Sequence, residues 1–379
     1  MGLRDDEVVL AINSGSSSLK AGFFVREGDD EREVLRCSAD GIGRADGSLR
    51  VVDGDGRELL HEAKDHASQE EALASFVSAA QKHGLKPAAV AHRVVHGGPE
   101  LTEHQVITPR VLDTLRAAEH FAPLHIPQAL KLIAAAEKQF PALPQVACFD
   151  TAFHQTMPES AKRFALPDEL YQRGVRRFGF HGLSYESIVH QLAGEMPEHV
   201  VVAHLGNGAS LCALHDGVSV DTTMGLTPTG GIPMATRSGD LDPGVMLFLM
   251  RTEAMDADAM EAMLNHRSGL IALSDGESDM KRLEELSAAG EASATLAVTV
   301  FVTAVRKAVG AYAALLGGID LLVFSGGIGE HSDAVRRAVC SGLEFMGLGA
   351  DGTKVRVVPA QEELQMARIS RGLLGGRRY

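Results

Sequence analysis

The feature that most constrains this chain is a segment that occurs twice, 192 positions apart (200 minus 8). Residues 8–22 read VVLAINSGSSSLKAG and residues 200–214 read VVVAHLGNGASLCAL. Each copy is an apolar run, a short loop of Gly, Ser and Asn, and a second apolar run, which predicts strand, tight loop, strand. Two unrelated turns would explain either copy alone, but the shared register favours a duplicated domain. The identical pairs are Val8/Val200, Val9/Val201, Ala11/Ala203, Ser18/Ser210, Leu19/Leu211 and Ala21/Ala213.

The two loops, residues 13–17 and 204–208, have a composition that suits anion binding. Loops of small residues expose backbone N–H groups that can surround an anion. Lys20 follows the first loop closely enough to reach a phosphate held there. One such loop in each half of the chain predicts two related domains that close on one polyphosphate.

The charge of the chain limits its partners. A length of 379 residues, with 45% hydrophobic and 23% charged residues, predicts a globular protein of two domains. The formal net charge of −14 argues against nucleic acid as a partner. An acidic protein that handles phosphates must concentrate positive charge locally, so arginines near the glycine-rich loops become candidate ligands.

The cysteines and the apolar segments predict a cytoplasmic protein. The cysteines form no CxxC pair and have no metal-ligand spacing, which is typical of reduced, mostly buried thiols. Residues 1–6 lack the apolar region of a signal peptide. Residues 296–316 form the most apolar expected helix, but charged residues and a glycine interrupt it, so no membrane span is expected. The cysteines are Cys37, Cys148, Cys212 and Cys340.

Two predicted strands of the first half end in charged residues. Arg93 lies at the exit of residues 88–98 (AAVAHRVVHGG), and Asp150 follows residues 145–149 (QVACF). Ligands of open α/β sheets bind at the carboxyl ends of the strands. Taken alone, Arg93 is equally well explained as a solvated strand-end charge, and Asp150 as a helix N-cap. The second domain is expected to start near Asp150.

Three segments of the second half are unusual for connecting loops. RRFGFHG, residues 176–182, contains His181, although a lone histidine more often packs in a core. Residues 221–244 form a long stretch, expected to be irregular, around Arg237, and such stretches are usually functional. Residues 325–331 (SGGIGEH) are expected to form a glycine turn between a strand and a helix, which places N–H groups near a nucleotide.

Together these segments resemble the acetate kinase family. AINSGSSSLK and HLGNG resemble its two phosphate loops, AVAHRVVHGG its His-Arg strand, FDTAFHQTMP its catalytic-aspartate segment and RFGFHG its histidine segment. TRSGDLDPG resembles its arginine loop, GGIGEH its adenosine loop and EEL its C-terminal metal segment. The resemblance implies an α/β fold of the actin, sugar-kinase and Hsp70 type, with two βββαβαβα domains at residues 1–150 and 151–362. It also implies an active site in the cleft between them, and a C-terminal helix, residues 363–375, that packs back on the first domain.

The same resemblance implies the site residues. The catalytic residues would be Arg93, Asp150, His181 and Arg237, with Asp150 orienting an arginine and organising metal-bound water. The acyl group would be bound by Arg93, Val95, Leu124, Phe180 and Pro228. Contacts to the nucleotide and its phosphates would come from Ser18, Lys20, His204, Leu205, Gly206, Asn207, Gly208, Asp279, Met280, Lys281, Gly327, Ile328, Gly329, Glu330 and His331. Asn13 and Glu362 would be associated with Mg²⁺, with Mn²⁺ as the alternative metal.

The activity that the resemblance implies is reversible, metal-dependent transfer of the γ-phosphoryl group between ATP and acetate, giving acetyl phosphate and ADP, in a homodimer. Propionate and butyrate kinases of the same family are the alternative, because PTGGIPMATR, residues 228–237, departs from the usual family sequence. An ATPase module of the Hsp70 or actin type would not explain Arg93 and Arg237. The choice of base stays open, since Lys281 and His331 stand where the family usually has Arg and Asn.

Overall fold

The computed structural model describes residues 3–15, 17–349 and 354–375, so Ser16 of the first expected phosphate loop lies outside the described residues. The chain forms two compact units. Unit 1 contains the described residues of Met1–Ala152, Gly182–Ser187 and Gln361–Tyr379, and unit 2 contains those of Phe153–His181 and Ile188–Ala360. Helix α6 (Gly182–Gln191) begins in unit 1 and ends in unit 2.

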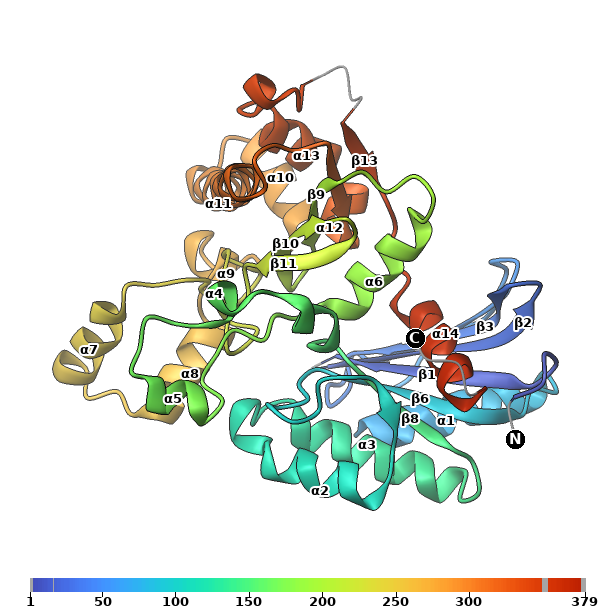
Figure 1. Cartoon of the computed structure of the whole chain (residues 1–379). Helices are drawn as coiled ribbons and strands as arrows, with labels where there is room; N and C mark the ends of the chain where they lie inside the picture. Colours follow the sequence, from blue (N-terminus) through green and yellow to red (C-terminus); the bar gives the residue numbers. More distant parts are fainter. Residues whose placement is uncertain (1–2, 16, 350–353, 376–379) are drawn as a thin grey trace. The chain divides into compact units, whose positions relative to one another are not determined.

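Unit 1 is an eight-stranded sheet with helices on both faces (Figure 1). Its elements are β1 (Val8–Ser14), β2 (Ser18–Glu27), β3 (Asp30–Asp40), β4 (Ser48–Asp53), β5 (Glu58–Ala63), α1 (Gln69–Lys82), β6 (Pro87–Val94), β7 (Gln105–Val106), α2 (Pro109–Ala117), η1 (Glu119–Phe121), α3 (Ile126–Gln139), β8 (Gln145–Phe149) and α14 (Glu362–Leu374). The strand order is β5-β4-β3-β2-β1-β6-β8-β7. Side chains of α1 and α3 pack on one face of this sheet, and those of α14 pack on the other.

Local sequence explains helix α1 well. Ser68 caps its N-terminus by accepting a hydrogen bond from the backbone N of Glu71. Glu70 and Glu71 lie in the first turn, where negative charge interacts favourably with the helix dipole. The buried residues recur at helical spacing, so one apolar face packs on the sheet. They are Ala72, Leu73, Phe76, Val77 and Ala80.

Unit 2 repeats the central topology of unit 1. Its elements are η2 (Ala152–Thr156, which begins at the last residue of a unit 1 segment), α4 (Glu159–Lys162), α5 (Asp168–Gln172), β9 (His199–Leu205), β10 (Ala209–His215), β11 (Val218–Thr222), α7 (Pro243–Thr252), α8 (Ala257–His266), α9 (Leu270–Leu273), α10 (Met280–Ala288), α11 (Ala292–Leu316), β12 (Leu321–Ser325), α12 (Gly326–His331), α13 (Asp333–Cys340), η3 (Glu344–Met346) and β13 (Val355–Val357). The order β11-β10-β9-β12-β13 matches β3-β2-β1-β6-β8 strand for strand. Within each matched set of five strands, the first two pairings are antiparallel and the last two are parallel. The duplication predicted from the repeated segment is therefore confirmed.

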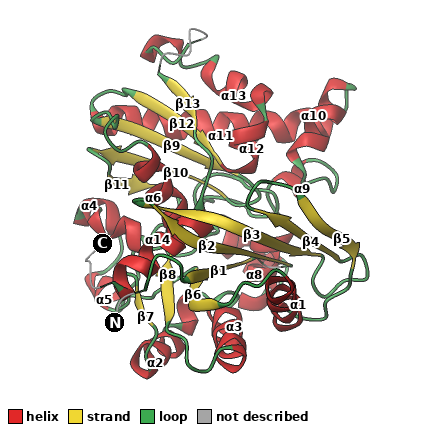
Figure 2. Cartoon of the chain, turned by 90° about the vertical axis from the view of Figure 1, so that its right-hand side faces the viewer, coloured by secondary structure: helices red, strands yellow, loops and turns green. Residues whose placement is uncertain are grey.

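Helix α11 lies along one face of the second sheet (Figure 2). Among the described residues it is the one helix long and apolar enough to cross a membrane, so its interruptions do not exclude a span by composition. Its buried side chains, however, recur every three or four positions. The opposite side carries the exposed residues Thr295, Thr299, Thr303 and Lys307. This one-sided pattern is typical of a core helix in a globular domain.

Two expectations about irregular segments are corrected. Residues 325–331 form not only a turn but the short helix α12, because Gly326 makes the turn with a φ of 74° and the residues after it are helical. The stretch expected to be irregular from residue 221 begins inside β11, which pairs with β10. All four cysteines are free of disulfide bonds, and three of them are buried, as expected.

Candidate active site

Arg93 and Asp150 form a bidentate ion pair at the carboxyl ends of two neighbouring strands of unit 1. Arg93 lies in β6, and Asp150 directly follows β8, which pairs in parallel with β6. Arg93 Nε lies 3.1 and 3.0 Å from the two carboxylate oxygens, and Nη2 lies 2.7 Å from Oδ2. Burial raises the pKa of Asp150, and the positive charge of Arg93 opposes that shift. Arg93 is therefore not a solvated strand-end charge.

Asn13 joins this ion pair to two glutamates. Asn13 Oδ1 accepts a hydrogen bond from Arg93 Nη1 at 3.0 Å, and Asn13 Nδ2 donates to Glu362 Oε2 and Glu363 Oε1, both at 2.8 Å. Both glutamates lie in the first turn of α14, where the helix dipole favours negative charge. The cluster contains one guanidinium and, with Asp150, three carboxylates. It therefore carries two excess negative charges, which one divalent cation would balance.

The first of the two loops predicted to bind phosphate joins β1 and β2 next to Asn13. Lys20 is the direct cross-strand partner of Asn13, so the two side chains lie on the same face of the sheet, and Lys20 is exposed. Gly15 N donates to the carbonyl oxygen of the half-buried Ser18 at 2.9 Å. A Cβ on Gly15 would lie only 2.6 Å from Ser18 Oγ, so a larger residue at this position would require the Ser18 hydroxyl to move. The hairpin thus holds Lys20 beside the cluster.

In unit 2, His181 and Arg237 both lie against the second predicted phosphate loop, residues 204–208. A Cβ on Gly208 would lie 3.2 Å from His181 Nε2 and 3.6 Å from Arg237 Nη1, so the glycine lets both side chains approach the loop backbone. His181 Nδ1 lies 2.8 Å from Ser210 Oγ. The imidazole ring of His181 stacks on that of His204, with centroids 4.4 Å apart. Two basic groups and the loop therefore converge within one unit.

The glycine turn at the start of α12 packs on the same loop. A Cβ on Gly326 would lie 2.7 Å from the carbonyl oxygen of Leu205, and one on Gly206 would lie 3.7 Å from Gly327 N. Leu205 is fully buried at the end of β9, whereas the side chain of Asn207 is exposed. The second phosphate loop and the predicted nucleotide turn therefore lie side by side.

The other predicted nucleotide contacts lie on two neighbouring helices of unit 2. Ser332, directly after α12, donates a hydrogen bond to Glu284 of α10, so the two helices are linked. Asp279 is the N-cap of α10; Met280 is buried and Lys281 is exposed. In α12, Gly327 and His331 are exposed, Ile328 and Glu330 are half-buried and Gly329 is buried.

The four apolar residues expected around an acyl group are divided between the units. In unit 1, Val95 directly follows β6 and is half-buried, and Leu124 is 37% exposed. In unit 2, Phe180 is 1% exposed and Pro228 is buried. The carbonyl oxygen of Pro228 accepts a hydrogen bond from Arg237 Nη1 at 3.2 Å. Pro228 is thus tied to one of the candidate catalytic residues.

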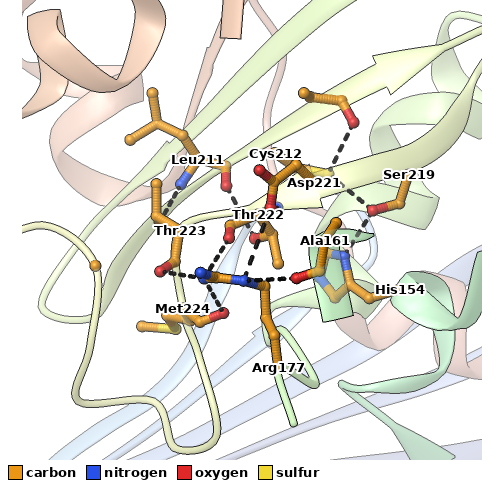
Figure 3. Close-up of polar contacts among 12 residues, drawn as sticks. His154, Ala161, Arg177, Leu211, Cys212, Ser219, Asp221, Thr222, Thr223 and Met224 are labelled. Atoms are coloured by element: carbon orange, nitrogen blue, oxygen red, sulfur yellow. Dashed lines mark hydrogen bonds and ion pairs between the residues drawn. The ribbon is translucent and has the colours of Figure 1, made fainter. Parts of the chain in front are cut away.

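Arg177 of the RRFGFHG segment donates hydrogen bonds to backbone carbonyl groups (Figure 3). Its Nη1 donates to the carbonyl oxygens of Thr222, Thr223 and Met224 at 2.8, 3.1 and 3.2 Å, and its Nε donates to that of Ala161 at 3.2 Å. These bonds fix the backbone that leads from β11 into the loop containing Arg237. Arg177 therefore holds the loop rather than facing a ligand.

Three side-chain contacts in the candidate site were not predicted from the sequence. Glu363 joins the carboxylate cluster, and its adjacency to Glu362 was the available signal. Ser210 contacts His181, and its signal was its match to Ser18 in the repeated segment. Glu330 Oε1 accepts hydrogen bonds from the backbone N of Gly326 and of Ala360, both at 3.0 Å. No local sequence pattern indicates that last role.

Comparisons with known proteins agree on one family. The model of the acetokinase family matches residues 8–368. An acetate kinase of Clavibacter michiganensis subsp. michiganensis is 41% identical, over 97% of this chain and 100% of its own. The crystal structure of Porphyromonas gingivalis acetate kinase has a TM-score of 0.84 at 35% identity, covering 97% of this chain and 100% of its own. A propionate kinase from Francisella tularensis subsp. tularensis has a TM-score of 0.87 at 31% identity, covering 96% and 98%. This chain belongs to the acetokinase family.

Proposed function

We propose that this protein is an acetate kinase that transfers the γ-phosphoryl group of ATP to acetate, reversibly and by direct in-line transfer. Besides the family, the observation that carries this proposal is the Arg93–Asp150 ion pair joined through Asn13 to Glu362. Formation of ADP measured with and without acetate tests it. ADP release should depend on acetate, whereas an ATPase of the Hsp70 or actin type would release ADP without an acid.

The chemical problem in this reaction is electrostatic. Both reactants are anions, and acetate is already ionised at pH 7, so no strong general base is needed. A guanidinium carries five N–H donors, and the bonds to Asp150 and Asn13 engage one on each nitrogen of Arg93. One N–H on each Nη atom remains to bind an anion. Arg93 would hold the carboxylate or phosphoryl oxygens in a fixed fork.

Asp150 would act as a positioning residue. In a kinase that phosphorylates a hydroxyl group, an aspartate at such a site would accept the hydroxyl proton, but a carboxylate acceptor has no proton to lose. The two oxygens of Asp150 instead receive hydrogen bonds from Arg93, Oδ1 from Nε and Oδ2 from Nη2. This bidentate contact fixes the plane of the guanidinium, which is what productive geometry requires.

The carboxylate cluster fits a hard divalent cation, Mg²⁺ or Mn²⁺. Glu362 and Glu363 place two carboxylates within 2.8 Å of one amide nitrogen of Asn13, a local excess of negative oxygen ligands. Mg²⁺ is usually bound by one or two carboxylates, waters and substrate phosphates. Bound there with ATP, the metal would neutralise charge on the phosphates. Asn13 would hold the glutamates in place, since its own oxygen accepts from Arg93.

Unit 2 would supply the nucleotide site and part of the charge stabilisation. The backbone N–H groups of residues 204–208 and Lys20 of unit 1 would bind phosphates. His181 Nε2 and Arg237 Nη1, which both lie against Gly208, would stabilise the transferring group. Residues 279–281 and 327–331 would line the base and ribose.

A propionate kinase is the second candidate. The structural neighbour from Francisella tularensis is described as a propionate kinase, and residues 228–237 of this chain depart from the usual family sequence. One methylene in an apolar pocket is worth only about 1–3 kcal/mol, so the two activities differ by degree. Val95, Leu124, Phe180 and Pro228 would set the preference for acetate.

We also infer a cytoplasmic homodimer. Helix α7 (sequence PGVMLFLMRT) has no buried residue, and Leu247, Phe248 and Met250 are 50%, 60% and 54% exposed. Apolar surface gathered on one helix is typical of a protein interface. A second copy of the chain would cover it. Light scattering should give a dimer for the unmodified protein and a monomer for Phe248→Asp; a monomeric unmodified protein would contradict the inference.

A further inference from the structure

A second cluster of possible metal ligands lies at the far end of the β9–β10 hairpin from its phosphate loop. His199 opens β9 and His215 closes β10, and the two residues are direct cross-strand partners. Their imidazole rings meet edge to face, with centroids 5.3 Å apart. Glu198 directly precedes β9 and approaches both rings. Among the residues that the structure describes, this is the group of His, Cys, Asp and Glu whose ligand atoms converge, all within 4.8 Å of one another.

The distances suit metal ligands better than hydrogen bonds. Glu198 Oε1 lies 3.7 Å from His199 Nε2 and 3.4 Å from His215 Nε2. Hydrogen bonds of this kind are normally about 2.7–3.2 Å long. Two ligand atoms that each lie about 2.0–2.1 Å from a tetrahedral Zn²⁺ are separated by about 3.3 Å. The two oxygen–nitrogen distances are therefore close to the edge of a coordination tetrahedron, and all three ligand atoms lie within 4.8 Å of one another.

Each imidazole also has a carboxylate on its other nitrogen. Asp320 Oδ2 lies 3.4 Å from His199 Nδ1, and Asp216 Oδ2 lies 3.4 Å from His215 Nδ1. Asp320 Oδ2 is held in place because it also accepts a hydrogen bond from the backbone N of His199 at 3.0 Å. Metal-bound histidines usually direct their second nitrogen to a carboxylate, which fixes the ring and its tautomer. Here both Nδ1 atoms face carboxylates at 3.4 Å, longer than a hydrogen bond but within reach of one after a small side-chain movement, and both Nε2 atoms face Glu198.

We propose that Glu198, His199 and His215 bind one late first-row divalent cation, Zn²⁺ being the best fit, with water completing the coordination. Two imidazoles and one carboxylate suit Zn²⁺, whereas Mg²⁺ and Ca²⁺ require oxygen ligands. The three carboxylates around the two rings supply the negative charge that such a cation needs. The site is separate from the candidate active site: residues 199 to 205 of β9 span about 20 Å at about 3.3 Å per residue. The cation would clamp the open end of the hairpin whose closed end is the second phosphate loop.

The test is calorimetric titration of EDTA-treated protein with Zn²⁺ in the presence of excess Mg²⁺, which occupies hard-cation sites. The unmodified protein should bind one Zn²⁺ per chain and unfold at a higher temperature when it is bound. His215→Asn and Glu198→Gln should each weaken that binding at least about tenfold. The matched control is His61→Asn: His61 Nδ1 lies 3.7 Å from Glu58, an exposed His–Glu pair with no second imidazole.

The Zn²⁺ titrations distinguish a specific site at Glu198, His199 and His215 from binding elsewhere. Loss of the tight site in His215→Asn and Glu198→Gln, with the control unchanged, supports the cation clamp. Equal Zn²⁺ affinity in the unmodified protein and in both variants overturns it, and so does the absence of a saturable site in the unmodified protein. Acetate-dependent ADP formation is read out in the same variants; because the clamp is distant from the candidate active site, its rate in Mg²⁺ without Zn²⁺ should be unchanged.

Discussion

Arg93 donates hydrogen bonds from both Nε and Nη2 to the carboxylate of Asp150, at distances of 2.7 to 3.1 Å. The contact uses the fork of the guanidinium, and Asp150 is 1% exposed, so the pair fixes the orientation of Arg93 in a largely dehydrated setting. The proposed chemistry depends on that orientation more than on the charge alone.

Arg93→Lys should therefore lower kcat/KM for acetate almost as much as Arg93→Ala. Each should lower kcat/KM for acetate by the equivalent of about 2–5 kcal/mol, because lysine keeps the charge and loses the fork. The matched control is Arg116→Ala, which removes an exposed arginine paired with Asp113 and should leave kcat/KM unchanged. Thermal unfolding of each variant separates lost chemistry from lost folding. Near-native kcat/KM in a folded Arg93→Lys variant would refute the orientation argument.

Arg237 is expected to act on the transferring group, whereas Arg177 holds backbone. Arg237→Ala should lower kcat/KM by the equivalent of about 2–5 kcal/mol in transition-state free energy, with a small change in melting temperature. Arg177→Ala should lower the melting temperature, because it removes a hydrogen-bond donor from the partly buried carbonyl groups of residues 222–224. Steady-state kinetics and thermal unfolding of both variants check this contrast. If Arg237→Ala turns over at the native rate with native KM values, Arg237 has no catalytic role.

Glu362→Gln should raise the Mg²⁺ concentration needed for half-maximal activity far more than it raises the KM for acetate, since it removes one hard, charged oxygen ligand. Glu70→Gln is the matched control, because Glu70 also lies in the first turn of a helix. A Mg²⁺ titration of activity distinguishes the two. If both variants titrate like the unmodified protein, Glu362 is only a first-turn carboxylate stabilised by the helix dipole.

His92 makes the fold sensitive to acid. Burial lowers the pKa of His92 from 6.5 to about 4, although its contact with Gln145 opposes the shift. The unfolded chain then takes up this proton more readily than the folded one, so stability is lost as the pH falls from about 6.5 to about 4. The loss should reach about 3 kcal/mol in the free energy of unfolding. Urea unfolding across this pH range should show a shallower loss for His92→Gln; identical slopes would show that His92 does not contribute.

Much of the fold could be predicted from local sequence patterns. The repeated segment predicted two equivalent hairpins, and the register of β1 with β2 and of β9 with β10 confirms both. These predictions succeeded because each hairpin is encoded within about fifteen consecutive residues. The helix in residues 326–331 was not expected, since its glycines disfavour helix and its start is stabilised by the side chain of Glu330.

The candidate site was harder to predict because it is assembled from distant parts of the chain. Asn13 and Glu362 are 349 positions apart and meet only because α14 returns to the face of the first sheet. No periodicity within either segment indicates that contact, so the residues could be named from the family resemblance but their hydrogen bonds could not. The sequence likewise did not indicate which arginine of RRFGFHG binds backbone, because three of the four carbonyl groups that accept hydrogen bonds from Arg177 lie 45 to 47 positions away.

Val95→Ala should shift the acid preference toward longer chains. The substitution removes two methyl groups just after the strand that carries Arg93, so the KM for propionate and butyrate should fall while that for acetate rises. The kinetic parameters for ATP should change little. If all three acids respond equally, Val95 does not line the acyl pocket.

The most direct test of acetate as the acceptor is kcat/KM for acetate, propionate and butyrate, measured on the unmodified protein at saturating ATP and Mg²⁺. The proposed small apolar pocket predicts the highest value for acetate and a decrease equivalent to about 1–3 kcal/mol for each added methylene. A higher kcat/KM with propionate or butyrate than with acetate would contradict it and would make this chain a kinase of the longer acid.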